Sequence, residues 1–270
     1  MQEFGSVWTT QKLDAVEAYL QAYTAIMKNQ KFQLCYIDAF AGSGSIVLKN
    51  GQQVDGSTIR ALKYPFDKYY FFEKKRANFN ALSKTVATHQ RKDDIELRNT
   101  DCNDLLAKID EFNWRQHNWR GVIFLDPYAM HLPWESLVKI SRTGVFDVWY
   151  LFPFMAVNRN LFKNKSMPAE NREILNEILG TTDWESEIYK ESDQMNLFGT
   201  TDYEKTDVDG VKQYIIKRLE ETFPTVSSKP IMLRTEKNSP IFLLCFAASN
   251  PNKTARDAAL RVANHILSRI

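Results

Sequence analysis

The chain has 270 residues, of which 44% are hydrophobic, and it carries 35 Lys or Arg against 33 Asp or Glu, for a formal net charge of +2. This length and apolar share predict one large α/β domain with a sizeable core, and they exclude a disordered chain. The near-neutral balance lacks the global basic signature of many nucleic-acid binders, but it leaves room for a local basic patch.

The chain has three cysteines, Cys35, Cys102 and Cys245, which lie far apart and form no CxxC pair. This pattern argues against a disulfide framework and a structural zinc site, and it favours a reducing compartment. The four histidines show no metal-ligand spacing, so we expect no metal. The first residues lack the apolar segment of a signal peptide, and no run of about 18 apolar residues occurs. We therefore expect a cytoplasmic protein without membrane association.

The first half of the chain alternates helix-like and strand-like segments. Residues 8–29 have helical periodicity, with Thr9 and Thr10 as candidate caps, and the apolar run 32–40 is typical of a strand buried on both faces. The alternation continues with a helix over 57–64 capped by Ser57, a strand over 68–75, a helix over 76–89, a strand over 95–101, a helix over 103–112, a strand over 121–128, a helix over 133–142 and a strand over 145–153.

The second half changes in character at residue 154. Residues 154–210 are polar and broken, with one clear helix at 168–180, which predicts an insertion over the open edge of the sheet that serves as a lid or recognises the acceptor. A helix over 209–222 follows, then an antiparallel hairpin turning at 236–239, and a last helix from Pro251 with Asn250 as its cap. We thus divide the chain into 1–153, 154–210 and 211–270, the last part completing the domain begun by the first.

Five strands alternating with helices predict a parallel, doubly wound sheet whose strand carboxyl ends meet at one edge, where such folds bind ligands. Four of the five strand ends carry an acid or a glycine turn, and the first three form a layout typical of a nucleotide-like ligand. The candidate ligand-binding residues are Asp38, Phe40, Gly42, Gly44, Glu73, Asp101 and Cys102. Here the glycines would let the backbone approach the ligand, Glu73 would accept hydrogen bonds from ribose hydroxyls, and Asp101 would accept one from an adenine amine, beside the main chain of Cys102.

Two ligands compete for this layout. A dinucleotide prefers the pattern G-x-G-x-x-G, but Val47 stands where its third glycine would be. S-adenosylmethionine carries no pyrophosphate and needs no third glycine. A late antiparallel strand also favours a methyltransferase, whereas dinucleotide domains generally stay parallel. A dehydrogenase is therefore a distant alternative.

The sequence blocks DAFAGSG, FFEK, TDCND and LDPY resemble the motifs of class I S-adenosylmethionine-dependent methyltransferases. In more detail, the blocks WTTQKLDAVEAYLQAY, YIDAFAGSG, DGSTIRAL, FLDPYAMHLPW and DVWYLFP resemble the three-Cys-motif partner protein family over nearly the whole chain. The resemblance implies a Rossmann-like methyltransferase fold: a seven-stranded, mostly parallel sheet with a C-terminal antiparallel hairpin and helices on both faces. It also implies a neighbouring three-cysteine-motif protein as a partner.

The turn Asp126-Pro127-Tyr128 resembles the D/N-P-P-Y/F turn of amino-methyltransferases, which holds the exocyclic amine of a target base. The resemblance implies that Asp126 accepts a hydrogen bond from the amine, that Pro127 stiffens the turn and that Tyr128 stacks on the base. The second proline is absent and Tyr128 stands one place early, so the turn is closer to the Asp-Pro-Phe-Gly turn of some tRNA guanine-N2 methyltransferases. The alternative interpretation of Asp126 and Pro127 is a simple helix start.

Two functions follow from these residues. In the first, the protein transfers methyl groups to a nucleobase amine in RNA or DNA, with Arg159, Lys163 and Lys165 of the insertion contacting phosphates. In the second, the protein keeps the ligand site but acts as a partner or recruiting subunit without turnover, which the altered Asp-Pro-Tyr turn would explain. Retained ligand binding without methyl transfer would distinguish the second function from the first.

Overall fold

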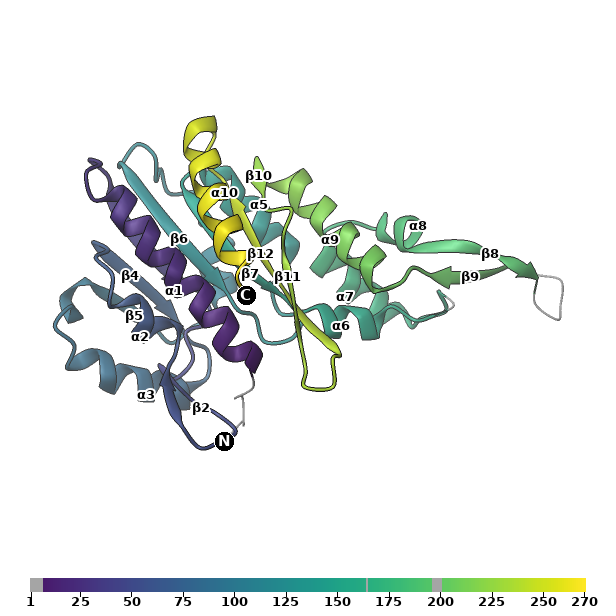
Figure 1. The fold of residues 1–270 in the computed structure, drawn as a ribbon, viewed down its shortest axis with the longest axis horizontal. Helices are drawn as coiled ribbons and strands as arrows, with labels where there is room; N and C mark the ends of the chain where they lie inside the picture. Colours follow the sequence, from purple (N-terminus) through teal and green to yellow (C-terminus); the bar gives the residue numbers. More distant parts are fainter. Residues whose placement is uncertain (1–6, 164, 196–200) are drawn as a thin grey trace.

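The structure is a computed structural model that describes residues 7–163, 165–195 and 201–270, and its centre is one large mixed sheet (Figure 1). The strands of this sheet are β1 (Gln33–Asp38), β4 (Lys68–Phe72), β5 (Ile95–Arg98), β6 (Trp119–Leu125), β7 (Phe146–Phe152), β10 (Thr225–Val226), β11 (Ile231–Arg234) and β12 (Pro240–Ala248). Two small hairpins lie outside it: β2 (Ser45–Val47) with β3 (Gln53–Asp55), and β8 (Tyr189–Met195) with β9 (Thr201–Lys205).

The strand order is β10-β12-β7-β6-β1-β4-β5, and β11 also pairs with β12. The pairs β6–β7, β1–β6, β1–β4 and β4–β5 are all parallel, whereas β12 is antiparallel to β7, β10 and β11. The sequence prediction of a mostly parallel, Rossmann-like sheet finished by an antiparallel hairpin is therefore confirmed. The sheet has eight strands because two short strands, β10 and β11, share one edge of β12.

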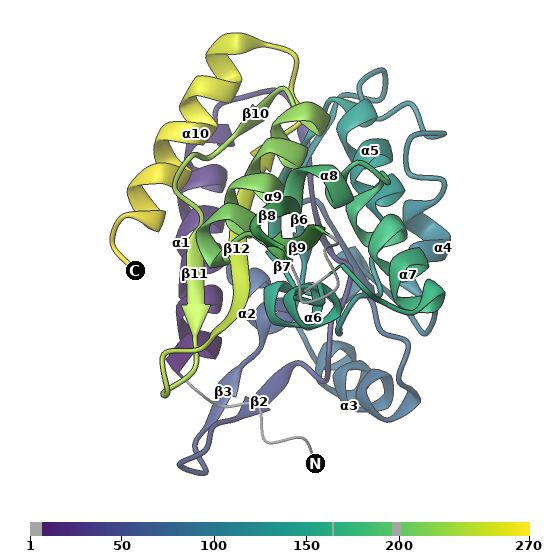
Figure 2. The ribbon, with the colours of Figure 1, turned by 90° about the vertical axis from the view of Figure 1, so that its right-hand side faces the viewer.

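Helices cover both faces of the sheet (Figure 2). They are α1 (Val7–Met27), α2 (Ser57–Ala61), α3 (Arg76–Ala87), α4 (Cys102–Leu106), α5 (Trp134–Thr143), α6 (Phe154–Asn160), α7 (Ala169–Leu179), α8 (Trp184–Ile188), α9 (Val208–Thr222) and α10 (Lys253–Leu267), with a short 3-10 turn at Lys92–Asp94. Residues of α1, α2, α3 and α10 pack on one face, and residues from α4 to α9 pack on the other.

Alternation along the strands explains the two layers, because successive side chains of a strand point to opposite faces. In β1, Tyr36 belongs to the core shared with α1, whereas Cys35 and Ile37 belong to the core shared with α5. Both sets are fully buried. This is why the central strands read as continuous apolar runs in the sequence.

Several predicted boundaries are wrong. Thr9 and Thr10 lie inside α1, Gly56 takes the N-cap position expected for Ser57, and Asn252 caps α10 in place of Asn250. The strand expected over 95–101 ends at Arg98. The helix expected over 103–112 spans only Cys102–Leu106, and Asp101 caps its start by accepting a hydrogen bond from the Asn103 backbone N–H. The two small hairpins were not predicted from the sequence. Residues 45–55 show only turn formers and residues 189–205 form a broken polar stretch, so the alternation of apolar and polar residues did not indicate strands there.

The segment 154–210 continues directly from β7 and belongs partly to the core. Phe154, Val157, Leu175 and Trp184 are fully buried in the same hydrophobic cluster as the sheet. The β8–β9 hairpin, in contrast, projects away from the sheet (Figure 1). The insertion therefore has a packed helical base and a protruding hairpin.

Candidate functional site at the carboxyl edge of the sheet

The predicted strand-end residues meet at one edge of the sheet because β1, β4, β5, β6 and β7 are parallel. Asp38 is the last residue of β1, Glu73 follows β4, and Asp126 follows β6. Asp101 begins α4 just after β5. The structure thus brings together the acids that the sequence singled out.

The turn after β1 is tied to both neighbouring strands. The backbone N–H of Ala39 donates to Phe124 O at 3.2 Å, and that of Ala41 donates to Phe72 O at 2.8 Å. Asp38 is fully buried beneath this turn and accepts a hydrogen bond from the Phe40 backbone N–H at 3.3 Å. Asp38 therefore positions the turn.

The two glycines of the turn serve different purposes. Gly42 and Gly44 both have positive φ, 64° and 83°, which is the region that favours glycine. A Cβ on Gly42 would meet no atom within 4 Å, whereas one on Gly44 would lie 2.9 Å from Leu82 Cδ1. Gly42 thus leaves open space beside the turn, and Gly44 is required for packing against α3. A Gly44→Arg substitution would therefore disturb the packing against α3, whether or not a ligand is bound.

Two of the acids are held by contacts around β4 and β5. Glu73, which is 8% exposed, accepts a hydrogen bond from the Lys75 backbone N–H at 2.6 Å through Oε1. Asp101 accepts from the Asn103 backbone N–H at 3.0 Å and from Lys74 Nζ at 2.9 Å. Burial works to raise the pKa of Asp101, but the Lys74 and Asn103 hydrogen bonds outweigh it and lower that pKa below its ordinary value. Lys74, which directly follows Glu73 in the chain, thus pairs with Asp101.

A chain of contacts connects this region with the Asp-Pro-Tyr turn. Lys75 Nζ lies 4.7 Å above the centre of the Tyr128 ring, and Tyr128 stacks on His131 with their ring centres 6.1 Å apart. Asn103 Nδ2 donates to His131 O at 2.8 Å. The ends of β4, β5 and β6 therefore surround one area. Tyr128 is 55% exposed, so it lies at the surface of this area.

Asp126 has a partner that the sequence analysis missed. Lys12 of α1 makes an ion pair with Asp126 Oδ2, and its ammonium also lies 5.3 Å from the centre of the Trp8 ring. Lys12 is only 6% exposed. It lies on the buried face of α1, near Leu13 and Val16, and a lysine within an apolar helical stripe is the signal that could have revealed it.

The remaining candidates differ in surroundings. Pro127 is buried, and Cys102 is buried at the start of α4, where burial raises the pKa of its thiol. Arg159 and Lys163 are exposed, but Lys165 lies 3.7 Å from Glu185 and 4.6 Å from the centre of the Tyr203 ring. Within the described residues, no group of three or more His, Cys, Asp or Glu could hold a metal ion, and no helix is long and apolar enough to cross a membrane.

The insertion touches the site through α6. Asn160 Nδ2 lies 3.8 Å from the sulfur of Met130, two residues beyond Tyr128. Lys205 of β9 donates to Leu161 O at 3.0 Å and to Asn158 Oδ1 at 3.0 Å, which fastens the hairpin to the end of α6. Arg159 on α6 is therefore attached to the same framework as the Asp-Pro-Tyr turn.

No family model matches the sequence, and no curated protein matches it. Among solved structures, the chain is similar to protein LPL1258 from Legionella pneumophila, with 12% identity, a TM-score of 0.53 and coverage of 96% of this chain and 91% of that chain. This likeness shows a shared fold.

Two further solved structures are similar at lower scores. One is the N-terminal domain of EvdMO1 with SAH bound, at 12% identity, 85% and 80% coverage and a TM-score of 0.43. Another is a putative S-adenosylmethionine dependent methyltransferase from Listeria monocytogenes, at 12% identity, 87% and 98% coverage and a TM-score of 0.41. These two TM-scores are too low to support a statement about the site.

The buried carboxyl of Asp38 predicts a pH dependence of stability. Burial raises its pKa from 3.8 to about 7, with the nearby Asp126 charge adding to the rise and hydrogen bonds from Ser57 and Phe40 opposing it. Between these pH values the folded protein binds a proton that the unfolded chain has lost. The free energy of unfolding should therefore fall as pH rises from about 4 to about 7. Urea unfolding of Asp38→Asn should show no such fall from this group, so the variant gains stability relative to the wild type with rising pH.

The matched control is Asp93→Asn, which changes an exposed carboxylate before the amino end of β5, away from the carboxyl edge of the sheet. Its stability difference from the wild type should stay constant over the same range. A constant difference for Asp38→Asn as well would contradict the assignment.

Proposed function

We propose that the protein is an S-adenosylmethionine-dependent methyltransferase that acts on an exocyclic amine of a nucleobase in RNA or DNA. The observation that carries the proposal is the meeting of Glu73, Asp101 and the Asp126-Pro127-Tyr128 turn around one area at the carboxyl edge of the sheet. The cofactor would lie over the β1 turn, with its ribose toward Glu73 and its adenine toward Asp101 and Cys102.

The geometry around each acid is compatible with these roles. Glu73 uses Oε1 for the Lys75 backbone N–H, so Oε2 is left for a ribose hydroxyl. Both oxygens of Asp101 have partners, but Lys74 is 76% exposed, and a surface ion pair of this kind contributes only about 0–1 kcal/mol. An adenine amine can therefore replace Lys74 at little cost.

The chemistry proposed for the Asp-Pro-Tyr turn rests on hydrogen bonding to the acceptor amine. The lone pair of an exocyclic amine is delocalised into the ring, so the amine is a poor nucleophile. Asp126 and a main-chain carbonyl of the turn would hold its hydrogens and favour a tetrahedral nitrogen. Lys12 would orient Asp126 through Oδ2 and leave Oδ1 for the amine. The sulfonium already activates the methyl group, so alignment and exclusion of water supply the rest of the catalysis.

The Lys12–Asp126 ion pair also favours the second candidate, a subunit that keeps the ligand site but does not turn over. In that role Lys12 would occupy the acceptor's place at Asp126 permanently. A three-cysteine-motif protein is the partner that the sequence resemblance proposes for either role. Ligand binding without methyl transfer would favour this candidate.

Cofactor binding is the first test. Calorimetry should detect S-adenosylmethionine and its demethylated product S-adenosylhomocysteine, and Glu73→Gln should weaken both by about tenfold, because one charge-assisted hydrogen bond to the ribose is lost. Glu135→Gln, at an exposed site on α5, is the control and should bind like the wild type. Tight binding of NAD without binding of either methionine compound would exclude the proposal.

The catalytic role of Asp126 is tested with the double variant Lys12→Met with Asp126→Leu, which removes the carboxylate acceptor together with the buried cation that pairs with it. Asparagine at position 126 would keep an acceptor oxygen, as in the D/N-P-P-Y/F turn. Transfer of labelled methyl groups to RNA or DNA should fall by about 10²-fold or more while affinity for S-adenosylmethionine is kept, because contacts of the transition state are lost. Tyr128→Ala should raise KM for the nucleic acid more than it lowers kcat, since base stacking contributes about 1–3 kcal/mol to binding.

Asp126→Ala is a poorer test because it leaves the buried Lys12 without its partner, and breaking a buried pair costs about 3–5 kcal/mol. The double variant Lys12→Met with Asp126→Leu removes this penalty, because neither charge of the pair remains. A folded double variant that transfers methyl groups at the wild-type rate would place the catalytic centre elsewhere.

The proposed phosphate contacts are tested by charge reversal in the insertion. Arg159→Glu and Lys163→Glu should weaken nucleic-acid binding, and each lost phosphate contact should flatten the plot of log affinity against log salt by about 0.7–0.9. Lys165→Glu should weaken nucleic-acid binding less than the other two variants, because Lys165 already contacts Glu185 and Tyr203. Lys92→Glu, exposed beside β5, is the control. An unchanged salt slope for Arg159→Glu and Lys163→Glu would remove the insertion from the recognition surface.

A further inference from the structure

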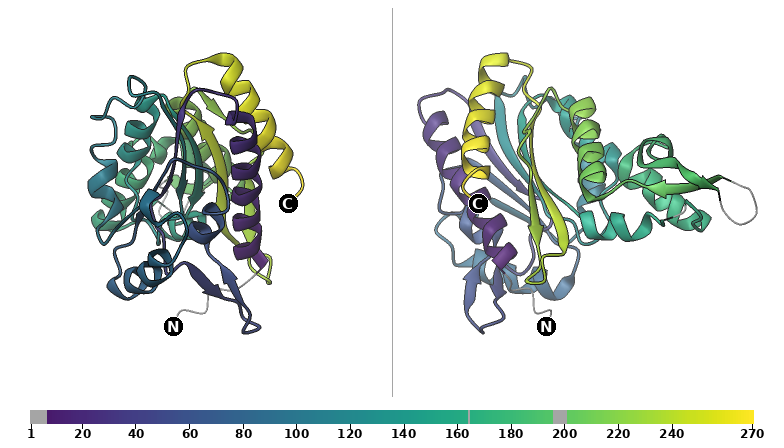
Figure 3. Two further views of the ribbon diagram at one scale, coloured as in Figure 1. Left: turned by 90° about the vertical axis from the view of Figure 1, so that its left-hand side faces the viewer. Right: turned by 45° about the vertical axis from the view of Figure 1, so that its right-hand side comes forward.

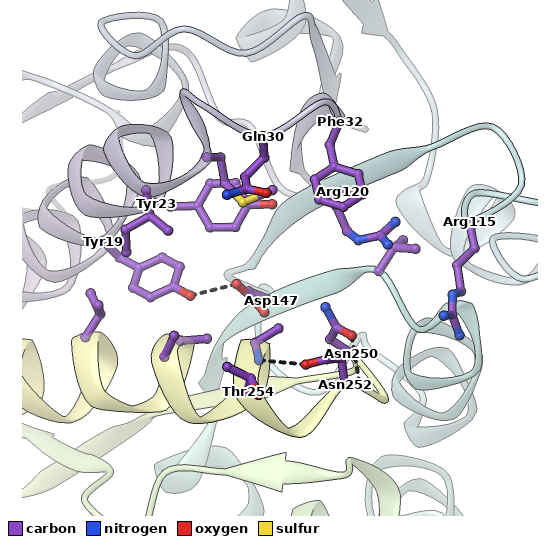
Figure 4. Close-up of a pocket in the computed structure, with 17 residues that line it drawn as sticks. Tyr19, Tyr23, Gln30, Phe32, Arg115, Arg120, Asp147, Asn250, Asn252 and Thr254 are labelled. Carbon is purple, nitrogen blue, oxygen red and sulfur yellow. Dashed lines mark hydrogen bonds between the residues drawn. The ribbon is translucent and has the colours of Figure 1, made fainter.

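A cavity lies at the opposite edge of the sheet, between α1 and α10 (Figure 4). These two helices run side by side on one face of the sheet (Figure 3). The cavity has a volume of about 580 Å³, within the range of sites for small molecules. Arg120 and Asp147, which line it, are near the amino ends of β6 and β7, whereas Asp126 follows the carboxyl end of β6. The cavity is therefore separate from the site described above.

The walls of this cavity are apolar and of unequal size. Tyr23 and Phe32 form the side next to α1 and β1, and Ala255, Ala258 and Ala259 of α10 form the other. The three alanines share one face of α10, at spacings of three and four residues. Their methyl groups are too short to reach the aromatic side chains, which is why a space remains between the helices.

One end of the cavity carries two guanidinium groups. In Figure 4, Arg115 and Arg120 lie toward the same end of the pocket, and Arg120 lies 4.2 Å from the centre of the Phe32 ring. No ion pair within the described residues involves either arginine, although Arg120 donates to Trp119 O at 2.6 Å. Burial, followed by the positive charge of Arg115, lowers the pKa of Arg120. Two neighbouring cations without a counter-ion favour an anion there.

The cavity also contains an acceptor, Asp147. Its Oδ2 accepts a hydrogen bond from the Tyr19 hydroxyl at 2.7 Å, which leaves Oδ1 for another donor. Burial raises the pKa of Asp147 to about 7, and the Tyr19 hydrogen bond opposes this only in part. No ion pair of the described residues joins Asp147 to either arginine, so the cations and the carboxyl are separately available. Asn250 lies between them and adds an amide.

We propose that this cavity binds a mononucleotide-like anion, with its ring between Phe32 and the alanine face of α10. A phosphate on the ligand would contact Arg115 and Arg120, and an N–H donor of the ring would bond to Asp147. A purely apolar ligand would leave the arginines unpaired, and an inorganic anion would leave the aromatic side uncovered. The phosphate could belong to a free nucleotide or to the end of a nucleic-acid chain.

The experiment is calorimetry of the full chain with the four ribonucleoside 5′-monophosphates, the matching nucleosides and inorganic phosphate. At least one nucleotide should bind at least tenfold more tightly than its nucleoside and than phosphate. Arg115→Ala and Arg120→Ala should each weaken that binding by about tenfold or more, because each removes a charge-assisted contact. Ala258→Trp should abolish binding by filling the space beside the aromatic side chains.

Two variants serve as controls. Arg261→Ala removes a guanidinium from the exposed face of α10 and should bind like the wild type, and Glu73→Gln separates this cavity from the S-adenosylmethionine site. Arg120→Ala removes the Arg120–Phe32 contact and could disturb the fold. Arg115 is exposed, so Arg115→Ala is expected to fold and keeps the test valid in that case. A 5′-phosphorylated oligonucleotide that competes better than the free nucleotide identifies a chain end as the source.

The proposal is overturned if no nucleotide binds, or if binding is as strong for inorganic phosphate alone. It is also overturned if Glu73→Gln abolishes nucleotide binding while Arg115→Ala and Arg120→Ala do not, because the nucleotide would then occupy the other edge of the sheet. Failure of S-adenosylmethionine to bind would leave these outcomes unchanged, since the cavity and the proposed S-adenosylmethionine site share no residue.

Discussion

The structure depends on how four carboxylates are accommodated at one edge of a parallel sheet. Parallel strands bring their carboxyl ends together, so Asp38, Glu73, Asp101 and Asp126 converge where their charges oppose one another. Each acid is compensated differently. Lys12 pairs with Asp126, Lys74 pairs with Asp101, and a backbone N–H binds Glu73. Asp38 lies buried beneath the β1 turn, and its pKa is raised in consequence.

The helix α1 takes part in this arrangement through its buried side. The helix covers one face of the central strands with Ala15, Val16 and Tyr19, and the same buried side of α1 carries Lys12 to the carboxyl edge. A further contact lies near the other end of that side, where Tyr19 donates to Asp147 at the amino edge. One helix thus holds a polar contact at each edge of the sheet, and the two proposed ligand sites lie at these two ends.

The insertion combines packing with projection. Its helical base shares the core with the sheet through Val157, Leu175 and Trp184, and Asn160 approaches the turn that contains Tyr128. The β8–β9 hairpin leaves this base and is anchored to it by Lys205. The packed base therefore touches the turn proposed to hold the acceptor, and the hairpin extends away from it.

The sequence by itself determined the order and type of the main elements, since short continuous apolar runs that alternate with helical segments and end in acids are typical of buried parallel strands. It also indicated the residues around the β1 turn and the Asp-Pro-Tyr turn, because glycine and proline act locally. Only the tertiary structure decided which partners these residues have. Lys12 is separated from Asp126 by 114 positions, and Tyr19 from Asp147 by 128. No local pattern encodes such pairs, and the α1–α10 cavity depends on how two distant helices pack.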